Sequence, residues 1–170
     1  MVEVTIDSVR VSLMSQHRIV VLKDTGASRY LPIWIGPYEA EAITIELQNV
    51  EVARPLTHDL LKATIEKLGA EIVQISITDL RNDTFYAEVA LSVDGRRLEI
   101  DSRPSDAIAL AVRAQVPVFV ADEVMDQAAI VPEPDLDTGL GATSEGAETE
   151  DKTPDAFSDF LEGLDLSGLD

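Results

Sequence analysis

Four polar residues around the segment SRPSDAIALAV, residues 102–112, could together act on a phosphodiester. Arg103 offers a guanidinium that can bind phosphate through two hydrogen bonds, at the predicted N-terminus of a helix, where anions are favoured. Asp106 and Asp101 could bind Mg2+ or Mn2+ and orient a water for attack, while Ser105 could contact the substrate. The competing interpretation is a capped helix in which Arg103 pairs with Asp101 or Asp106.

A second group of polar residues, Arg54, His58 and Asp59, lies in the segment ARPLTHDLL. His58 would occupy the first turn of a helix, where the positive end of the helix dipole favours the neutral imidazole. A neutral imidazole suits a general base, with Asp59 beside it and Arg54 available to bind substrate. The competing interpretation is structural, because an aspartate in the first turn of a helix is ordinary helix electrostatics.

Two further pairs have weaker chemical interpretations. Glu39 and Glu41 diverge on a helix because they are two positions apart, so they predict a solvated face and not a shared ion site. Tyr30 and Trp34 are four apart on a predicted strand and point to one face. They could stack on bases, but packing in the core or against another subunit is the more typical role of such a pair.

Composition limits the chemistry further. The 170-residue chain has no cysteine and two histidines, so a metal would be held mainly by oxygen, and no glycine-rich nucleotide motif indicates an organic cofactor. The net charge is −19: residues 1–131 carry 20 acidic and 12 basic side chains, and residues 132–170 carry 12 and one. This balance argues against a protein that binds nucleic acid over a wide surface, and leaves only a weak or local contact.

Apolar periodicity predicts an α+β fold with a mixed, mainly antiparallel sheet and three main helices. The first helix begins at Pro37 and runs to about Asn49, the second has Thr57 as its N-cap and Gly69 just past its end, and the third begins at Pro104. A further helical turn is expected near residue 122. Strands are expected over residues 2–12, 18–22, 29–35, 71–80, 84–93, 96–101 and 117–121.

The two halves of this predicted core resemble each other. Each has a hairpin followed by a helix that starts with proline, which indicates a duplicated hairpin-plus-helix unit. Matching residues are separated by a constant offset of 67 positions: Pro37 and Pro104, Glu39 and Asp106, Ala40 and Ala107, Ala42 and Ala109.

Three linked motifs, LPIWIGPYEAEAI, RPLTHDLL and RPSDAIALAVR, resemble the bifunctional nuclease family in their order and spacing. That family comprises small bacterial and plant domains credited with cleaving both DNA and RNA. The resemblance covers residues 1–131 and implies an α+β fold, self-association and phosphodiester hydrolysis. The residues that fall on the matching motifs are Glu39, His58, Asp59, Arg103, Ser105 and Asp106.

The remaining residues have the composition of an appendage. Residues 132–154 are rich in acids, proline, glycine and threonine and predict a disordered linker, and residues 155–170 predict an acidic tail with a short amphipathic helix. Such a helix could dock on a protein partner. The chain shows neither a signal peptide nor eighteen consecutive apolar residues, so we expect a cytoplasmic protein without membrane contact.

Two functions are therefore compatible with the sequence. The first is a nuclease that hydrolyses DNA, RNA or both, with or without a divalent metal, and whose catalytic residues are His58, Asp59, Arg103 and Asp106. The second is a non-enzymatic binding or regulatory module whose acidic tail engages a protein partner.

Overall fold

The computed structural model describes residues 1–12 and 17–132, and these form the predicted α+β fold. Three helices of eleven residues and one of seven accompany seven strands. In chain order the elements are β1 (Val2–Val11), β2 (Arg18–Asp24), β3 (Tyr30–Ile35), α1 (Pro37–Leu47), α2 (Thr57–Lys67), β4 (Ala70–Arg81), β5 (Thr84–Val93), β6 (Arg96–Ser102), α3 (Pro104–Ala114), β7 (Val118–Val120) and α4 (Asp122–Ala128).

The strands form one mixed, mainly antiparallel sheet, as predicted, and their order in it is β3-β2-β1-β7-β4-β5-β6. The short strand β7 joins the two halves, since it pairs antiparallel with β1 and parallel with β4. Within that strand, Val118 has Val4 as its partner on one side and Ile75 on the other. The outer strands β3 and β6 are the two edges of the sheet.

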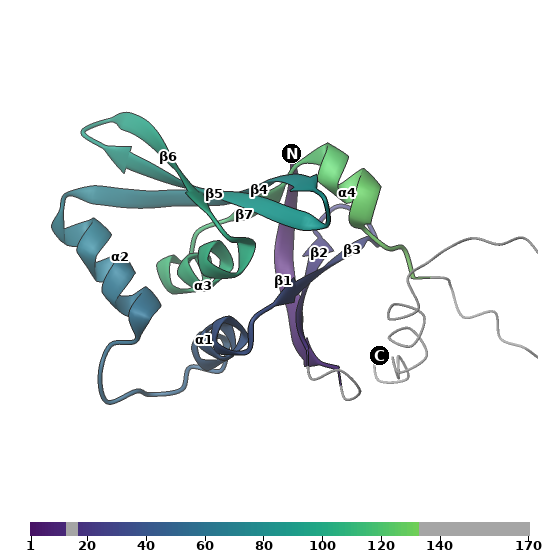
Figure 1. The fold of residues 1–170 in the computed structure, drawn as a ribbon. Coiled ribbons are helices and arrows are strands. Elements are labelled where there is room, and N and C mark those ends of the chain that lie inside the picture. The colour runs from purple at the N-terminus through teal and green to yellow at the C-terminus, as the bar shows by residue number, and fades with distance from the viewer. Residues whose placement is uncertain (13–16, 133–170) are drawn as a thin grey trace, which may run out of the picture. The chain divides into compact units, whose positions relative to one another are not determined.

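The halves on either side of β7 repeat one connectivity. In each, three antiparallel strands are followed by a helix that begins with proline: β1-β2-β3-α1 and β4-β5-β6-α3. The repeated unit therefore contains one strand more than a hairpin. Figure 1 shows the two three-stranded segments running in different directions, with α3 lying in the angle between them.

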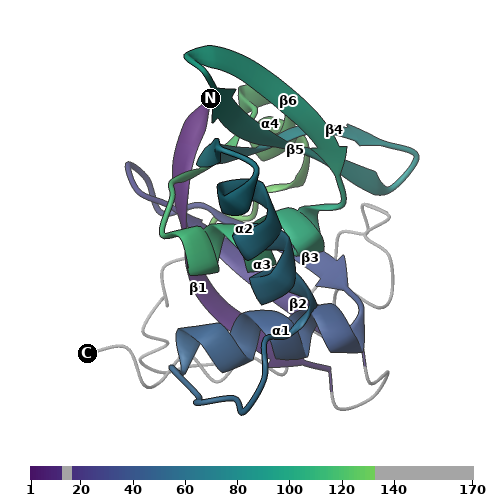
Figure 2. The ribbon, with the colours of Figure 1, turned by 90° about the vertical axis from the view of Figure 1, so that its left-hand side faces the viewer.

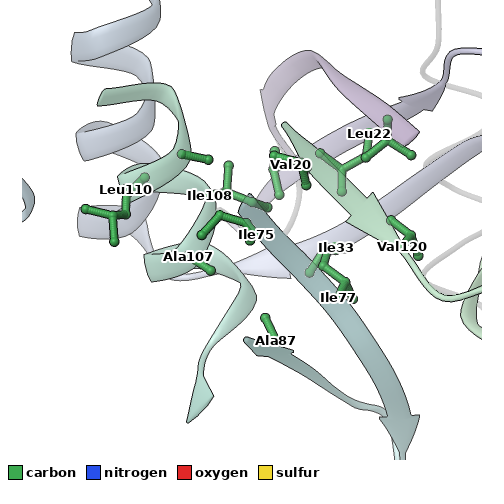
Figure 3. Packing of buried hydrophobic residues seen from close by; sticks show 14 of the residues in the cluster. Val20, Leu22, Ile33, Ile75, Ile77, Ala87, Ala107, Ile108, Leu110 and Val120 are labelled. Carbon is green, nitrogen blue, oxygen red and sulfur yellow. The ribbon is translucent and has the colours of Figure 1, made fainter. Parts of the chain in front are cut away.

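Helices α1, α2 and α3 lie together on one side of the sheet (Figure 2), with α3 packed against both of the others. Eight of the eleven residues of α3 are buried, including alanines at 107, 109 and 111, whose small side chains let neighbouring elements approach closely. Its Ile108 joins one apolar cluster with Ile75 of β4, Val20 of β2 and Val120 of β7 (Figure 3). This cluster fixes the position of the helices relative to both halves of the sheet.

Most strand ends lie within one or two residues of prediction, two helix ends differ from it, and one hairpin turn matches it. The N-cap of α2 is Leu56 and not Thr57, because the Asp59 carboxylate accepts the Leu56 N–H at 2.7 Å and the helix starts one residue earlier. Helix α1 ends at Leu47, before the predicted Asn49. The Asp94-Gly95 hairpin turn is confirmed, with φ angles of 49° and 75° that suit glycine at its second position.

Among residues 1–12 and 17–132, no helix has the length and apolar character needed to cross a membrane. The predicted acidic linker and amphipathic tail helix fall after residue 132, outside the described residues, and stay predictions. Self-association also stays a prediction.

Candidate functional site

A chain of bonded side chains connects the N-terminal ends of the three long helices. Nε2 of His58, on α2, lies 3.1 Å from Oδ1 of Asp106, on α3. The other carboxylate oxygen of Asp106 accepts a hydrogen bond of 2.6 Å from Nε of Arg103. Arg103 also donates from Nη2 to Oε1 of Glu39, on α1, at 2.8 Å. Three of the predicted site residues, His58, Arg103 and Asp106, are thus brought together.

The prediction that Glu39 and Glu41 form a solvated face is wrong for Glu39. Its side chain bonds Arg103 and is mostly buried. Glu39 and Asp106 occupy equivalent positions in the repeated units and both bind the same arginine. Gly36, which stands where the second unit has Arg103, leaves room for this arrangement, since a Cβ atom there would overlap the Glu39 carboxylate. The repeat therefore produces one arginine-centred cluster and not two.

The geometry defines the chemistry open to His58. An ionised Asp106 carboxylate can only accept hydrogen bonds, so the neutral tautomer of His58 that bonds it is the one with the proton on Nε2, and in that tautomer Nδ1 can accept a proton. The carboxylates of Asp106 and Glu39 raise the pKa of Arg103, so this guanidinium stays charged. The Arg103 side chain is 67% exposed, whereas His58 is almost buried. A buried imidazole and an accessible cation therefore bond to the same carboxylate.

Asp59 was predicted to assist His58, but its carboxylate is engaged elsewhere. One oxygen accepts the N–H of Leu56, and the other accepts Nε of Arg113 at 2.5 Å. The Arg113 side chain is 3% exposed and also donates to the carbonyl oxygens of Ala109, at 2.8 Å, and Ala42, at 3.1 Å. Arg113 thereby ties α1, α2 and α3 together beneath the site.

Sequence reasoning did not single out Arg113. In the sequence, Arg113 stands out only as a cation in an otherwise apolar stretch of helix. A basic residue in the last turn of a helix is common because it interacts with the helix dipole, so this feature does not indicate a buried ion pair. The burial of its side chain, and its bond to a residue 54 positions away, depend on how the helices pack.

Asp59 makes the stability of the fold depend on pH. Burial raises the pKa of Asp59, but the Leu56 N–H and the Arg113 guanidinium outweigh it and hold the pKa below its usual 3.8. Because the folded-state pKa is depressed, this stabilisation is present above the usual value and is lost as the pH falls through the folded-state value. We expect the free energy of unfolding of Asp59→Asn to fall less than that of the wild type between about pH 6 and pH 3.

Urea unfolding at the two pH values measures this difference. The acid sensitivity contributed by Asp24, Asp79 and Asp122, whose pKa values are also lowered, remains in the variant and cancels in the comparison. An equal decline in both proteins would show that the bonds of Asp59 do not stabilise the fold.

Two surface depressions meet at Arg103 and Asp106, which line both of them. The larger, of about 610 Å³, runs over α1 and α2 and also contains Glu39 and His58. The smaller, of about 430 Å³, lies over β5, β6 and the start of α3 and contains Asp101. We call them the helical groove and the strand groove. The bonded chain therefore lies on a surface that a ligand can reach.

Two predicted substrate-binding residues do not line these grooves. Ser105 is buried in the first turn of α3 and lines neither groove. Arg54 is exposed in the loop between α1 and α2 and likewise lines neither groove. Arg103 is the predicted substrate-binding residue that does lie at the grooves, so it is the one we assign to the site.

Asp101 lies in the strand groove near Asp106, where the sequence predicted a metal. No group of three or more His, Asp or Glu side chains suited to a metal occurs within residues 1–12 and 17–132. Both oxygens of Asp106 are already bonded. Metal binding by these two aspartates therefore stays a prediction, and Mg2+ held there would need further ligands from water and substrate phosphate.

Comparison with known proteins assigns the family. The model of the bifunctional nuclease domain matches residues 20–133, which include His58, Arg103 and Asp106. An uncharacterized protein of Mycobacterium tuberculosis is 38% identical over 162 residues, 95% of this chain and 94% of that protein. Bifunctional nuclease 2 of Arabidopsis thaliana is 33% identical over 108 residues, 61% of this chain and 33% of the plant protein.

A rice relative agrees with this assignment. Bifunctional nuclease 1 of Oryza sativa subsp. japonica is 30% identical over 107 residues, 61% of this chain and 32% of the rice protein. The chain thus aligns with about a third of each plant protein and with nearly all of the mycobacterial one. On the match of the family model to most of its length, the chain belongs to the bifunctional nuclease domain family.

Proposed function

We propose that this chain hydrolyses phosphodiester bonds in DNA or RNA at the grooves that meet at Arg103 and Asp106. The observation that carries the proposal is the convergence of His58, Asp106 and Arg103 from two separate helix N-termini onto an accessible surface. Membership of a family whose plant members are named bifunctional nucleases supports the same reaction.

His58 is the general base in this proposal. Its Nδ1 takes a proton from the attacking water as the water oxygen bonds to phosphorus and the bond from phosphorus to the leaving oxygen breaks. The leaving oxygen keeps the electron pair of that bond and takes a proton from solvent, and the His58 imidazolium returns its proton to solvent before the next turnover. Asp106 holds the imidazole ring through Nε2 and stabilises the positive charge that forms on it, as a carboxylate does in a Ser-His-Asp triad. The general base therefore depends on an orienting carboxylate from a different helix.

Arg103 is the phosphate-binding group. Its bonds to Asp106 and Glu39 use two of the five N–H donors of a guanidinium, so donors remain for phosphate oxygens without breaking either bond. A guanidinium at this position stabilises the negative charge that develops on the transferred phosphoryl group. The two carboxylates that bind Arg103 fix its orientation before the substrate arrives.

The test is hydrolysis of single-stranded DNA, duplex DNA and RNA by the purified wild type and by Asp106→Asn. We expect the variant to lose about 10²- to 10⁴-fold in kcat, because an amide no longer fixes the required tautomer of His58. Asp126→Asn is the matched control, since Asp126 is exposed on α4 and lines neither groove. Equal activity in wild type and Asp106→Asn would assign the cleavage to a contaminating nuclease and refute the proposal.

The same assay, run with a chelator and with added Mg2+ or Mn2+, tests the proposed metal. Activity that disappears with the chelator and returns with the ion, but not in Asp101→Asn, would support binding at Asp101 and Asp106. Activity indifferent to the chelator would leave His58 as the base without a metal.

The second candidate function is a non-enzymatic binding module. It is favoured by one observation: the carboxylate oxygens of Asp106 and Asp59 are all bonded within the fold, as expected for groups that stabilise helix ends. Under this alternative the wild type cleaves no substrate above background, and Asp106→Asn changes stability alone. A protein partner for the acidic tail belongs to this proposal.

A further inference from the structure

We infer that the site takes one unpaired dinucleotide step, with its phosphate on Arg103 and the two flanking bases stacked on Tyr38 and Tyr86. This inference rests on the proposed function and names its substrate class, single-stranded nucleic acid. It comes from the arrangement of the two grooves and from an exposed tyrosine in each of them; the strand groove also contains Phe85, which is partly buried against the core.

The grooves place an aromatic ring on each side of one guanidinium. Arg103 and Asp106 line both grooves and so form the boundary between them. Tyr38, in the first turn of α1, lines the helical groove, and Tyr86, on β5, lines the strand groove. A nucleotide chain that crosses this boundary with a phosphate at Arg103 would have one nucleoside in each groove.

Both tyrosines are available to a ligand. Tyr38 is 81% exposed, so the packing of the fold does not account for a large aromatic ring at this position. Tyr86 is 37% exposed, and the Arg81 guanidinium lies 5.0 Å from its ring centroid. Arg81 does not itself line the strand groove, and its guanidinium covers one face of the Tyr86 ring.

Charge shows why stacking must supply much of the affinity. Among the described residues that line these two grooves, Arg103 is the only lysine or arginine, and the grooves also carry Glu39, Glu41, Asp101 and Asp106. Nucleic-acid binding through phosphates draws its affinity from several such cations, and a single one provides little. Stacking on an aromatic ring does not depend on net charge and tolerates any base.

The inferred substrate is single-stranded for a geometric reason. In a duplex the neighbouring bases stack on each other and pair with the opposite strand, so they cannot lie in separate grooves on either side of one phosphate. Single strands, loops and frayed ends can place their bases this way. The site should therefore prefer unpaired DNA or RNA over duplex.

Binding of fluorescein-labelled oligonucleotides, followed by fluorescence anisotropy, tests the inference separately from cleavage. The probes are a single-stranded thymidine decamer, an abasic decamer with the same phosphates and a duplex of the same length. We expect Tyr38→Ala and Tyr86→Ala each to raise the Kd for the thymidine decamer about tenfold, with no change for the abasic decamer. Tyr38→Phe should bind as the wild type does.

The matched control is Trp34→Ala. Trp34 is an exposed aromatic residue on β3 that lines neither groove, so its loss should leave all three Kd values unchanged. Unchanged Kd values in both tyrosine variants, or a loss confined to Trp34→Ala, would overturn the inference. Wild-type protein that binds the decamer through both tyrosines but cleaves nothing would refute the proposed function and leave this inference standing.

Discussion

Replacing His58 with alanine is expected to slow phosphodiester hydrolysis by about 10²- to 10⁴-fold, the usual contribution of a positioned general base. The loss should appear in kcat, because in the proposed mechanism His58 acts on the attacking water whereas Arg103 binds the phosphate. Single-turnover rates with excess enzyme on a single-stranded oligonucleotide measure the chemical step directly. The same variant should bind that oligonucleotide with nearly the wild-type Kd.

The chain provides its own control, because it has one other histidine. The His17 ring lies edge-on to Trp34, with 5.4 Å between ring centroids, and lines neither groove, so His17→Ala should retain full activity. Added imidazole should restore part of the rate of His58→Ala by entering the space left beside Asp106. A structural defect would not respond to imidazole, so the absence of rescue together with equal losses in both histidine variants would remove His58 from the mechanism.

The largest effect on stability is expected for Arg113→Met. Removing one partner of a buried ion pair typically lowers the free energy of unfolding by about 3–5 kcal/mol. Because the Asp59 side chain is 27% exposed, we expect a loss at the lower end of this range, about 3 kcal/mol. The substitution also removes the hydrogen bonds that join α3 to α1 and α2. Urea unfolding followed by circular dichroism measures the free energy, with an unchanged m-value as the check on two-state behaviour.

Arg103→Met is the control for the loss of unfolding free energy expected of Arg113→Met. Both arginines belong to the α3 segment and both bind carboxylates on other helices, but the Arg103 side chain is 67% exposed and that of Arg113 is 3% exposed. Exposed ion pairs contribute about 0–1 kcal/mol, so Arg103→Met should unfold almost as the wild type does. Similar losses in the two variants would contradict the assignment of Arg113 to structure and Arg103 to substrate.

The sequence allowed good prediction of features that depend on neighbouring residues. Proline at 37 and 104 marked two helix starts, and Asp94-Gly95 marked a hairpin, because backbone sterics at these residues decide the conformation locally. The fold class followed from the order of such elements. His58, Arg103 and Asp106 were identified as candidates because each stands at a predicted helix N-terminus.

The partners of these residues could not be predicted in the same way. The sequence offered Asp101 or Asp106 as the partner of Arg103, and the structure pairs it with Asp106. The bond of Asp106 to His58, however, spans 48 positions and that of Arg103 to Glu39 spans 64. Asp59 lies next to His58 in the sequence and yet bonds Arg113. Such pairings depend on how α1, α2 and α3 pack on the sheet, and residue spacing within one element carries no information about that packing.

The position of β7 has a consequence for the kinetics of folding. This strand lies at the centre of the sheet but is the last of the seven in the chain, and its partners Val2 and Val4 are among the first residues. The two three-stranded segments have mostly local contacts and can form early, whereas the sheet cannot close until residues 118–120 have been synthesised. During synthesis on the ribosome, the β1 edge of the N-terminal segment therefore stays unpaired until β7 has been made. An unpaired strand edge can pair with other chains, so the nascent chain is exposed to aggregation during this time.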